Sequence, residues 1–418
     1  MHNGLQGAVL WQTENDAVPT YFIENEAYFN REEFYGLGDR DYPDNLERFV
    51  FFCKAALEGC KTIDFSPDVI HCNDWQTAAL PGILKATYVA YRKDPFFSPV
   101  PKLVYTIHNI SYQGRFFEDH WQILSLPRSY YTYDFEFYGQ INLTKSAIHL
   151  ADAITTVSET YAREIRTTDF GFGLQDALQG RKENLYGILN GVDYQQWRPD
   201  TDPYTYGIHY SADDLAGKRR IKSKLREEHS LPDRDDVPLI GMTTRFVEQK
   251  GIDLITECAE RILQLDTQMI VLGSGDPRYH DFFEWLRRSY PDRVGIYIGF
   301  NNELAHKIEA GADIFLMPSL FEPCGLNQIY SLKYGTLPIV RLTGGLADTI
   351  EDGVNGFTFF DFNAKEFYAA AQRAIDGYRN HPDKWQQMMI TAMAQDFSWE
   401  KSAEKYLAVY NQVLGKLG

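Results

Sequence analysis

The chain has 418 residues, of which 44% are hydrophobic, so it can bury a sizeable core, and its length indicates two or three domains. The formal net charge of -17 disfavours nucleic acid or an anionic membrane as a general partner, because either would need a basic face. These values predict a globular protein and leave room for a local basic pocket.

Cysteine content and hydropathy indicate the cellular compartment of the protein. The five cysteines are odd in number and show no paired C-x-x-C spacing, which disfavours a disulfide framework or a structural zinc site. No stretch approaches the ~20 apolar residues of a membrane span, and the N-terminus lacks the basic start and apolar run of a signal peptide. We therefore expect a cytoplasmic protein with no membrane partner.

Short apolar, β-branched runs alternate with amphipathic stretches along the chain. Runs of this kind predict an α/β protein whose parallel sheets are covered by helices on both faces. In chain order, the expected strands are residues 68–71, 102–109, 153–158, 185–191, 237–245, 268–275, 294–299, 313–319 and 336–340.

A passage rich in Pro, Asp, Tyr and Gly, residues 189–237, separates the first four strands from the rest. Such a passage between two α/β series indicates a crossing between domains. We expect a first domain over 1–188 and a second over 189–396, and the spacing in 397–418 predicts a C-terminal helix. In doubly wound sheets ligands bind beyond the carboxyl ends of the strands, so a cleft between the domains is the expected site.

Several informative side chains stand directly after the expected strands, where that rule places a ligand. They are His108, Asn190, Arg245 with Lys250, Phe300 and Glu322. Arg245 and Lys250 lie in a short loop that enters a helical stretch, and two cations beside free backbone amides can bind a diphosphate. For this pair alone, charges that keep the surface soluble are an equally good interpretation.

Two adjacent glycines, Gly344 and Gly345, follow the strand expected at 336–340. Without a Cβ they let backbone N–H groups approach an anion closely, and a helix expected to start at Leu346 would add its positive dipole end. A plain turn from strand to helix is the alternative on spacing alone.

Other phosphate, metal and nucleophile motifs do not occur in the sequence. There is no GxxxxGK[ST], and GSGDPR at 273–278 fails GxGxxG, which disfavours a P-loop NTPase or an ordinary dinucleotide dehydrogenase. His71, Cys72 and Asp74 are close in sequence, but alternate strand residues point to opposite faces, so core or hydrogen-bonding roles are favoured over a metal site. No G-x-S-x-G elbow is present.

Glu322 stands between an apolar run and a segment with helical spacing, in SLFEPCGLNQIY at 319–330. A charged side chain after a strand is usually a solvated loop residue. Pro323 and Gly325 predict a turn after it, which would let the carboxylate face a ligand at the end of the strand.

Nine segments in order carry a resemblance to a known family. They are YGLGDRDYPDN (35–45), DVIHCNDWQTAALPG (68–82), YTIHNISYQG (105–114), FEFYGQINLTKSAI (135–148), TTVSETYAREI (155–165), GILNGVD (187–193), TTRFVEQKGIDL (243–254), IGFNNELAHKI (298–308) and PSLFEPCGLNQIYSLKYGTLPIVRLTGGLADTIEDGVNGF (318–357). Together they resemble bacterial-type glycogen and starch synthases, which are retaining glucosyltransferases of the GT-B fold with two doubly wound, Rossmann-like domains. The resemblance runs from about residue 20 to the end, and it implies that the C-terminal helix in 397–418 packs back on the first domain.

The resemblance implies that ADP-glucose donates a glucosyl unit to the non-reducing 4-OH of an α-1,4-glucan, glycogen or starch, with retention of configuration. It implies that Arg245 and Lys250 bind the diphosphate and stabilise the leaving ADP, where preorganised donors lower the barrier. The residues that it implies on the donor side are Asn190, Phe300 beside the adenine, Gly325, Leu326, and amides near Thr343, Gly344 and Gly345 for the distal phosphate. Those that it implies on the acceptor and sugar side are Asp74, His108 and Tyr138.

By the same likeness, Glu322 holds hydroxyls of the donor sugar or supports positive charge at the anomeric centre, and both roles stay open. No metal or cofactor is implied, because cations and amides replace a divalent cation at the diphosphate. In the wider superfamily a second Glu stands eight positions after the first, whereas Tyr330 stands here, as in the glycogen synthase branch. Cys324 is either structural or an oxidation-sensitive thiol.

One part of the family pattern is missing. The family begins with a strand and a Lys-x-Gly-Gly-Leu loop, and nothing in residues 1–30 matches it, so we expect a first domain that lacks about a hundred residues. Such a loss would expose sheet edges and apolar faces and make the chain poorly stable or prone to aggregate. Two rival functions follow: an inactive glucan- or nucleotide-binding remnant, and a GT-B transferase that uses another nucleotide sugar.

Overall fold

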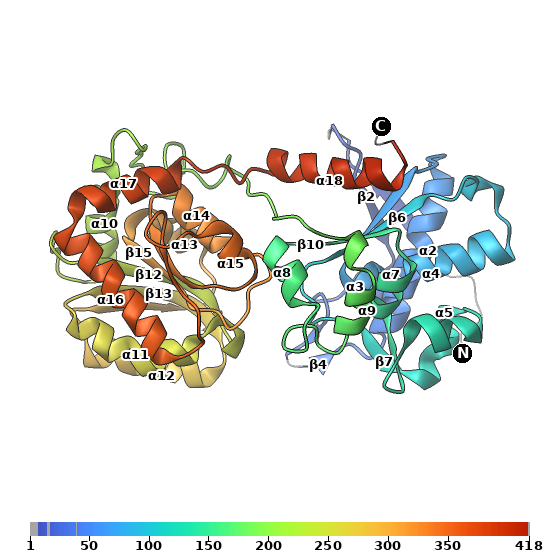
Figure 1. Ribbon diagram of the computed structural model, residues 1–418, viewed down its shortest axis with the longest axis horizontal. Helices are drawn as coiled ribbons and strands as arrows, with labels where there is room; N and C mark the ends of the chain where they lie inside the picture. The colour runs from blue at the N-terminus through green and yellow to red at the C-terminus, as the bar shows by residue number, and fades with distance from the viewer. Residues whose placement is uncertain (1–6, 15–16, 39, 417–418) are drawn as a thin grey trace. The chain divides into compact units, whose positions relative to one another are not determined.

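The computed structural model describes residues 7–14, 17–38 and 40–416, and its contacts divide the chain into two compact units (Figure 1). As far as they are described, Met1–Thr156, Ala162–Tyr186 and Leu407–Gly418 form the first unit, and Val157–Tyr161 and Gly187–Tyr406 form the second. Helix α18 (Trp399–Val413) therefore begins in the second unit and ends in the first. Within the described residues, we find no helix that is both long and apolar enough to cross a bilayer.

The first unit contains a four-stranded sheet in the order β11-β10-β6-β5. Its central strand β6 is buried over five consecutive residues, the near-continuous apolar run that a parallel strand with both faces covered requires. The strand β5 ends the sheet and pairs only with β6. The bounds are β5 (Val69–Asn73), β6 (Lys102–Ile107), β10 (Ala153–Thr156) and β11 (Leu185–Gly187).

Helix α2 (Asn45–Thr62) shows how the sequence builds the cover of the first unit. Its buried apolar residues Leu46, Val50, Cys53 and Leu57 recur every three or four positions, which puts them on one face. The other helices are α1 (Glu26–Phe29), α3 (Asp74–Thr77), α4 (Leu80–Ile83), α5 (Trp121–Leu124), α6 (Arg128–Tyr130), α7 (Leu143–Leu150) and α9 (Gln175–Gly180), with α8 (Glu159–Glu164) at the boundary between the units.

Three small antiparallel sheets complete the first unit. They are β1 (Val9–Gln12) with β2 (Tyr21–Glu24), β3 (Gly36–Leu37) with β4 (Arg40–Asp41), and β9 (Gln140–Asn142) between β7 (Arg115–Phe117) and β8 (Glu136–Phe137). Trp11 lies opposite Phe22 in the first of them, and the two residues are 58% and 57% exposed. Exposed apolar surface was expected here, and the poor stability expected with it stays a prediction.

The second unit contains a six-stranded parallel sheet in the order β14-β13-β12-β15-β16-β17. Its strands are β12 (Leu239–Phe246), β13 (Gln268–Gly275), β14 (Val294–Ile298), β15 (Ile314–Met317), β16 (Leu337–Arg341) and β17 (Phe357–Phe359). All nine strands expected from the sequence are present, and only β17 and the small antiparallel strands were not foreseen. These missed strands have four residues or fewer, too few for a clear apolar pattern.

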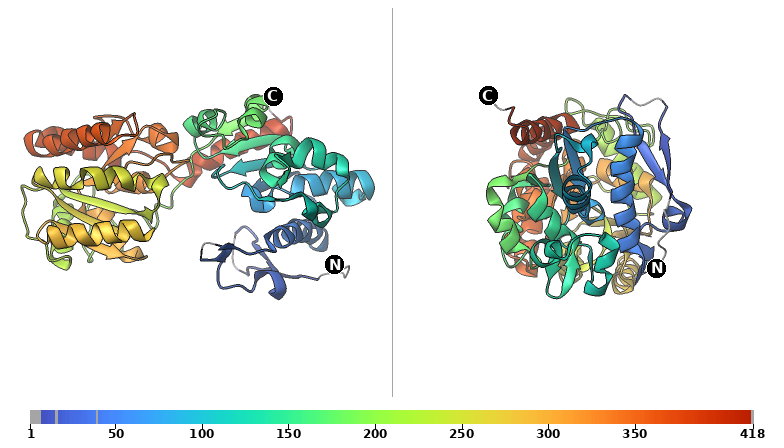
Figure 2. Two further views of the ribbon diagram at one scale, coloured as in Figure 1. Left: turned by 90° about the horizontal axis from the view of Figure 1, so that it is seen from below. Right: turned by 90° about the vertical axis from the view of Figure 1, so that its right-hand side faces the viewer.

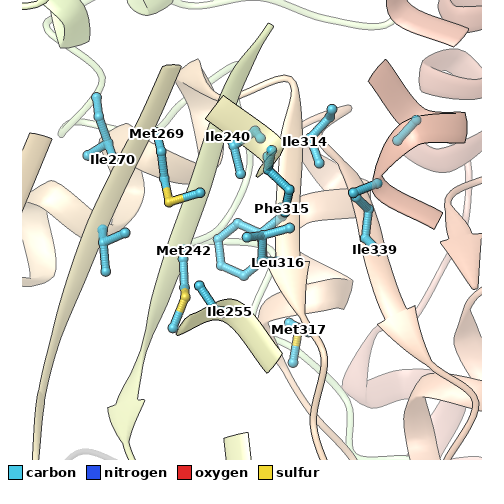
Figure 3. Packing of buried hydrophobic residues seen from close by; sticks show 14 of the residues in the cluster. Ile240, Met242, Ile255, Met269, Ile270, Ile314, Phe315, Leu316, Met317 and Ile339 are labelled. Atoms are coloured by element: carbon cyan, nitrogen blue, oxygen red, sulfur yellow. The ribbon is translucent and has the colours of Figure 1, made fainter. Parts of the chain in front are cut away.

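Helices cover both faces of this sheet (Figure 1, Figure 2). Side chains of β12, β13, β15 and β16 pack with Ile255 of α11 around the buried ring of Phe315 (Figure 3). Full burial of such a side chain contributes about 1.5–3 kcal/mol, so this core fixes the strand ends that carry the site. The helices are α10 (Ala216–Glu228), α11 (Ile252–Gln264), α12 (Pro277–Ser289), α13 (Asn302–Gly311), α14 (Asn327–Lys333), α15 (Gly344–Thr349), α16 (Ala364–Asn380) and α17 (Pro382–Met393).

Candidate active site

The two strand series of the second unit diverge between β12 and β15. The strands β12, β13 and β14 follow one another in one direction across the sheet, and β15, β16 and β17 follow in the other. At such a switch point the loops after the two central strands turn apart, which leaves room for a ligand at the carboxyl ends. β12 leads to Arg245 and Lys250 and β15 leads to Glu322, so the fold brings these three predicted residues to one place.

Glu322 is 6% exposed and is held through one of its two carboxylate oxygens. Lys250 Nζ donates to Oε2 over 2.6 Å, and Ser319 Oγ donates to the same oxygen over 3.1 Å. The other oxygen, Oε1, has no hydrogen-bond partner among the described residues. It is also not fully buried, so it is accessible to a ligand. The carboxylate is thus oriented and charge-paired on one side and open on the other.

The backbone of the loop that carries Glu322 is braced by side chains that we did not single out from the sequence. Arg341 Nε donates to the Ser319 carbonyl over 3.1 Å, and Gln249 Nε2 donates to the Phe321 carbonyl over 3.2 Å. Arg341 is the last residue of β16, the strand next to β15, so its contact depends on strand pairing. Ser319 had a usable signal, because it precedes Glu322 by three residues in the same turn.

Two glycines let the loop after β16 interlock with the loop that carries Glu322. Gly344 has a φ of +43°, and a Cβ there would lie 2.0 Å from the Glu322 carbonyl oxygen. A Cβ at Gly345 would lie 2.0 Å from the Cys324 carbonyl oxygen. The Gly345 N–H donates to the carbonyl oxygens of Glu322 and Pro323 over 3.1 Å. Both glycines are therefore required by a close approach of two backbones.

This arrangement changes two details of the sequence interpretation. Helix α15 starts at Gly344 rather than at Leu346, because Thr343 is its N-cap residue and the glycines form its first turn. The Gly345 N–H is committed to carbonyl oxygens, so it does not belong to the amides that could face a phosphate. Thr343 is fully buried beside them. A phosphate role for the other amides of this loop stays a prediction.

The two predicted diphosphate ligands are held differently. Arg245 is exposed, and its guanidinium has no hydrogen bond or ion pair with the described residues. Lys250 is half-buried in its ion pair with Glu322, and the next residue, Gly251, has a φ of +70°. A Cβ at Gly251 would lie 2.0 Å from the Pro318 carbonyl oxygen, so this loop also contacts the loop after β15. With one carboxylate between two cations, the local charge favours an anion.

A small cavity of about 90 Å³ opens beside Glu322. Thr243 lines it, and its Oγ1 is buried without a hydrogen-bond partner in the protein, which makes it a group that a ligand could satisfy. Asn327 Nδ2 donates to the Thr243 carbonyl over 2.7 Å. Gly325, at a φ of +71°, and Leu326 also line the cavity, so both predicted donor-side residues lie at this site.

Asn190 and Cys324 are neighbours in the second unit. The Asn190 Oδ1 atom is buried and has no hydrogen-bond partner within the described part of the chain, so it is a group that a ligand could satisfy. Burial raises the pKa of Cys324 to about 12, and a backbone hydrogen bond from Asn190 opposes this shift. A buried thiol with so little thiolate at neutral pH favours the structural role of Cys324 over oxidation sensitivity.

Phe300 follows β14, which is separated from β12 by β13. Its side chain is 91% exposed, and no ring of the described residues contacts it. It is the largest exposed fraction among the large hydrophobic side chains that the structure describes. Such a ring has a free face on which a flat ligand group could stack.

In the first unit the fold brings Asp74 and His108 together, because they follow the paired strands β5 and β6. Asp74 Oδ1 accepts the backbone N–H of His108 over 2.8 Å, and His108 Nε2 lies 3.0 Å from Asn73 Oδ1. Burial raises the pKa of Asp74, whereas the charge of His108 and the N–H groups of His108 and Asn109 act in the opposite direction. Tyr138 is 85% exposed in the turn between β8 and β9, and no described hydrogen bond or ring contact joins it to this pair.

No group of three or more His, Cys, Asp or Glu side chains within residues 7–14, 17–38 and 40–416 could hold a metal ion. His71 instead lies 2.7 Å from the Tyr410 hydroxyl and 2.5 Å from Thr106 Oγ1, and Cys72 is buried. These are the hydrogen-bonding and core roles that the sequence favoured. Metal-independent catalysis stays a prediction.

Two family descriptions match the chain: a starch synthase catalytic domain over residues 1–180 and glycosyl transferases group 1 over residues 223–390. Glycogen synthase 1 of Geobacter metallireducens is 44% identical over 96% of this chain and 80% of its own length. Glycogen synthase of Desulforudis audaxviator is also 44% identical, over 97% of this chain and 81% of its own.

The solved structures agree with these relatives. The catalytic domain of starch synthase IV from Arabidopsis thaliana, bound to ADP and acarbose, is 34% identical with a TM-score of 0.88, covering 98% of this chain and 85% of that one. A sucrose-phosphate synthase from Thermosynechococcus elongatus, 19% identical with a TM-score of 0.58, covers 91% of this chain and 83% of that one and shares the fold alone. The chain has the GT-B fold and belongs to the glycogen synthase family of glycosyltransferases.

Proposed function

We propose that this glycogen synthase uses ADP-glucose and extends the non-reducing end of an α-1,4-glucan with retention of configuration. The observation that carries the proposal is Glu322, held by Lys250 at the switch point of the second sheet with Oε1 open and the Arg245 guanidinium free. The starch synthase with a TM-score of 0.88 supports the donor and the acceptor class, because its structure contains ADP and acarbose.

The donor diphosphate binds to Arg245 and Lys250 in this proposal. As the bond between the anomeric carbon and the phosphate oxygen breaks, negative charge grows on the leaving ADP. Fixed cations at that point lower the barrier, and removal of one such donor typically costs about 10²–10³ in kcat. The acceptor 4-OH forms the new bond, and its proton passes to the leaving phosphate.

Glu322 binds a hydroxyl of the donor glucose through Oε1. Lys250 occupies Oε2, which lowers the carboxylate's strength as a nucleophile and fixes the direction of its free oxygen. Asn190, Gly325 and Leu326 line the donor sugar, and the exposed Phe300 ring stacks on the adenine. The distal phosphate lies against the loop of Thr343 and Gly344 in this proposal.

The first unit supplies the acceptor side. Asp74 fixes the backbone of His108, whose ring then contacts the reacting sugar, and the exposed ring of Tyr138 lies against the glucan. We assign residues 1–188 to this acceptor domain, 189–396 to the nucleotide-sugar domain, and 397–418 to a helix that returns to the acceptor domain. No metal takes part, and the enzyme works in the cytoplasm.

A donor panel tests the proposal. The purified chain is incubated with glycogen and ADP-glucose, UDP-glucose or GDP-glucose, and glucose incorporation is measured with and without EDTA. We expect ADP-glucose to give the highest rate and EDTA to have no effect. A higher rate with another donor would assign a different nucleotide sugar, and folded protein that binds ADP without turnover would assign an inactive remnant.

A further inference from the structure

A second, larger cavity of about 620 Å³ lies at the amino ends of the strands of the second sheet. Asp313, which directly precedes β15, and Asp236, which lies before β12, line it, and its walls include residues of α10, α16 and α17. Glu322 follows the other end of β15, and this strand of four residues spans about 13 Å at about 3.3 Å per residue. The cavity is therefore separate from the carboxyl edge that holds the candidate active site.

Two buried lysines of α10 line this cavity, and only one of them is fully paired. Lys222 Nζ donates to Asp313 Oδ2 over 2.6 Å, to the Val237 carbonyl over 2.9 Å and to the Tyr378 hydroxyl over 2.8 Å. These three acceptors account for all three of its N–H groups. Lys222 is thus a structural ion pair and is not available to a ligand.

Lys218 is 4% exposed and has no ion pair within 4.0 Å among the described residues. Its ammonium donates to the Ala310 carbonyl over 3.0 Å and to Thr336 Oγ1 over 2.7 Å, and it lies 5.8 Å from the centre of the Tyr210 ring. One of its three N–H groups therefore has no oxygen acceptor among the described residues. Burial lowers the pKa of Lys218 to about 7, while the charges of Asp313 and Glu309 act in the opposite direction. A buried cation with an unused donor is costly unless an anionic group approaches it.

The charged groups at the cavity wall limit the charge of an occupant. Arg219, the next residue along α10, is exposed, and the described residues give its guanidinium no hydrogen bond or ion pair. Arg379 is tied to Asp266. Asp236 pairs with Arg234 over 3.1 Å, whereas the described residues give the Asp235 carboxylate no ion pair. Asp235 would repel a doubly charged phosphate more strongly than a singly charged carboxylate.

Part of the cavity lining is apolar. Trp385, Met389 and Pro382 from α17 and Leu215 from the segment before α10 line it. Pockets of ~300–1,000 Å³ with mostly apolar walls and a few placed polar groups are typical of sites for small organic ligands.

We propose that this cavity is a second ligand site, for a small organic carboxylate whose charged end binds Lys218 and Arg219 and whose apolar or aromatic body lies against Trp385 and Met389. A carboxylate has two oxygens, so it can accept hydrogen bonds from the Arg219 guanidinium and from the Lys218 ammonium at once. Because the cavity lies at the opposite end of the sheet from Glu322, its occupant is neither the donor nor the acceptor of the transfer.

The test uses 4-(trifluoromethyl)benzoate as the probe, observed by fluorine NMR with the full chain, and the neutral 4-(trifluoromethyl)benzamide as its matched control. We expect saturable binding of the benzoate, at least about tenfold weaker binding of the benzamide, and no displacement of the benzoate by saturating ADP. Displacement by ADP would show that the probe reports the nucleotide site, and would overturn the proposal whether or not the chain is a synthase.

Variants assign the probe to this cavity. Arg219→Ala changes an exposed side chain, so the chain should fold normally and bind the benzoate about five- to tenfold more weakly. Lys218→Met should abolish binding, with thermal melting as the check on folding. Arg220→Ala is the control, because Arg220 is exposed on the same helix and lines a different cavity. No saturation in the wild type up to about 10 mM, or unchanged affinity in Arg219→Ala, would contradict the proposal.

Discussion

The two units hold their candidate site residues in different ways. In the second unit Glu322 has two side-chain donors on one oxygen, and its loop is locked against two other loops through backbone contacts at Gly344, Gly345 and Gly251. In the first unit one hydrogen bond joins Asp74 to the His108 backbone, and Tyr138 is exposed in a turn.

This difference matches the two tasks of a glucosyltransferase. Stabilising charge on a leaving diphosphate requires donors that are already fixed before the reaction, because reorganising them would add to the barrier. Holding a long, neutral glucan requires accessible rings and hydrogen-bonding groups that can accommodate many positions of the polymer. The comparison therefore predicts that small backbone changes are far more damaging in the second unit than side-chain changes in the first.

The largest expected effect comes from unlocking the loops of the second unit. Gly344→Ala would place a Cβ 2.0 Å from the Glu322 carbonyl, so we expect activity to fall by more than about 100-fold and stability by about 1–3 kcal/mol. Gly353→Ala is the matched control, since Gly353 also has a positive φ, +71°, with nothing within 4 Å of the added carbon. Equal losses in both variants would mean that backbone strain alone, and not the interlock, matters.

The next largest effect distinguishes the role of Arg245 from that of Lys250. Arg245→Met should lower kcat with ADP-glucose by about 10²–10³ and leave the melting temperature unchanged, because the Arg245 guanidinium has no partner among the described residues. Lys250→Met should cost similar activity and also stability, because it leaves the buried Glu322 carboxylate without its ion pair. Melting curves and steady-state rates of both variants check this. A strong loss of stability in Arg245→Met would contradict the proposed free guanidinium.

A pH effect of intermediate size is expected in the first unit. Burial lowers the pKa of His71 to about 4, with the charge of His108 acting in the same direction, whereas a histidine in an unfolded chain has a pKa of about 6.5. The folded state therefore prefers neutral His71. This preference adds about 3 kcal/mol to the free energy of unfolding. The contribution is complete above pH ~6.5, falls as the pH drops and is lost at about pH 4.

Denaturant unfolding at pH 7 and pH 5 measures this contribution, of which about 2 kcal/mol should disappear over that interval. His71→Gln should be less stable at pH 7, because it disturbs the contacts with Tyr410 and Thr106, but should lack this part of the pH dependence. His120→Gln serves as the control at an exposed histidine of the same unit. An unchanged pH slope in His71→Gln would exclude His71 as the titrating group.

The smallest effect is expected at Phe300. Replacing its exposed ring by Leu should weaken ADP binding about three- to tenfold, the loss of one stacking contact of ~0.5–1.5 kcal/mol, and should leave kcat nearly unchanged. Calorimetric titration with ADP measures the affinity directly. Trp285→Leu is the control, because Trp285 is a partly exposed aromatic residue elsewhere in the unit, on α12. This variant should bind ADP as the wild type does.

The sequence predicted the parts of the molecule that depend on local pattern. The strand runs were correct, because apolar periodicity determines which segments form strands, and chain order then determines which side chains follow them at the carboxyl edge of the sheet. It did not predict that the Gly345 N–H is taken by Glu322 and Pro323, or that Arg341 braces Ser319, because both depend on contacts between separate loops.

Tyr330 is a further example of a contact that the chain pattern does not reveal. Its ring stacks on Trp197, with ring centroids 4.0 Å apart and an interplanar angle of 10°. Trp197 also stacks on His306, whose Nδ1 lies 2.8 Å from Asp202. Spacing from Glu322 shows only that a tyrosine replaces a glutamate, whereas the structure gives that tyrosine a packing role.

The central claim is that Glu322, oriented by Lys250 and Ser319, acts on the donor sugar rather than on the nucleotide. The most direct test measures glucose incorporation from ADP-glucose and ADP affinity in Glu322→Gln, which keeps the shape of the side chain and removes its charge. Our account predicts that kcat falls by at least about 100-fold while the Kd for ADP changes by less than about threefold. Activity within about threefold of the wild type, or a loss of ADP binding as large as the loss of activity, would contradict it.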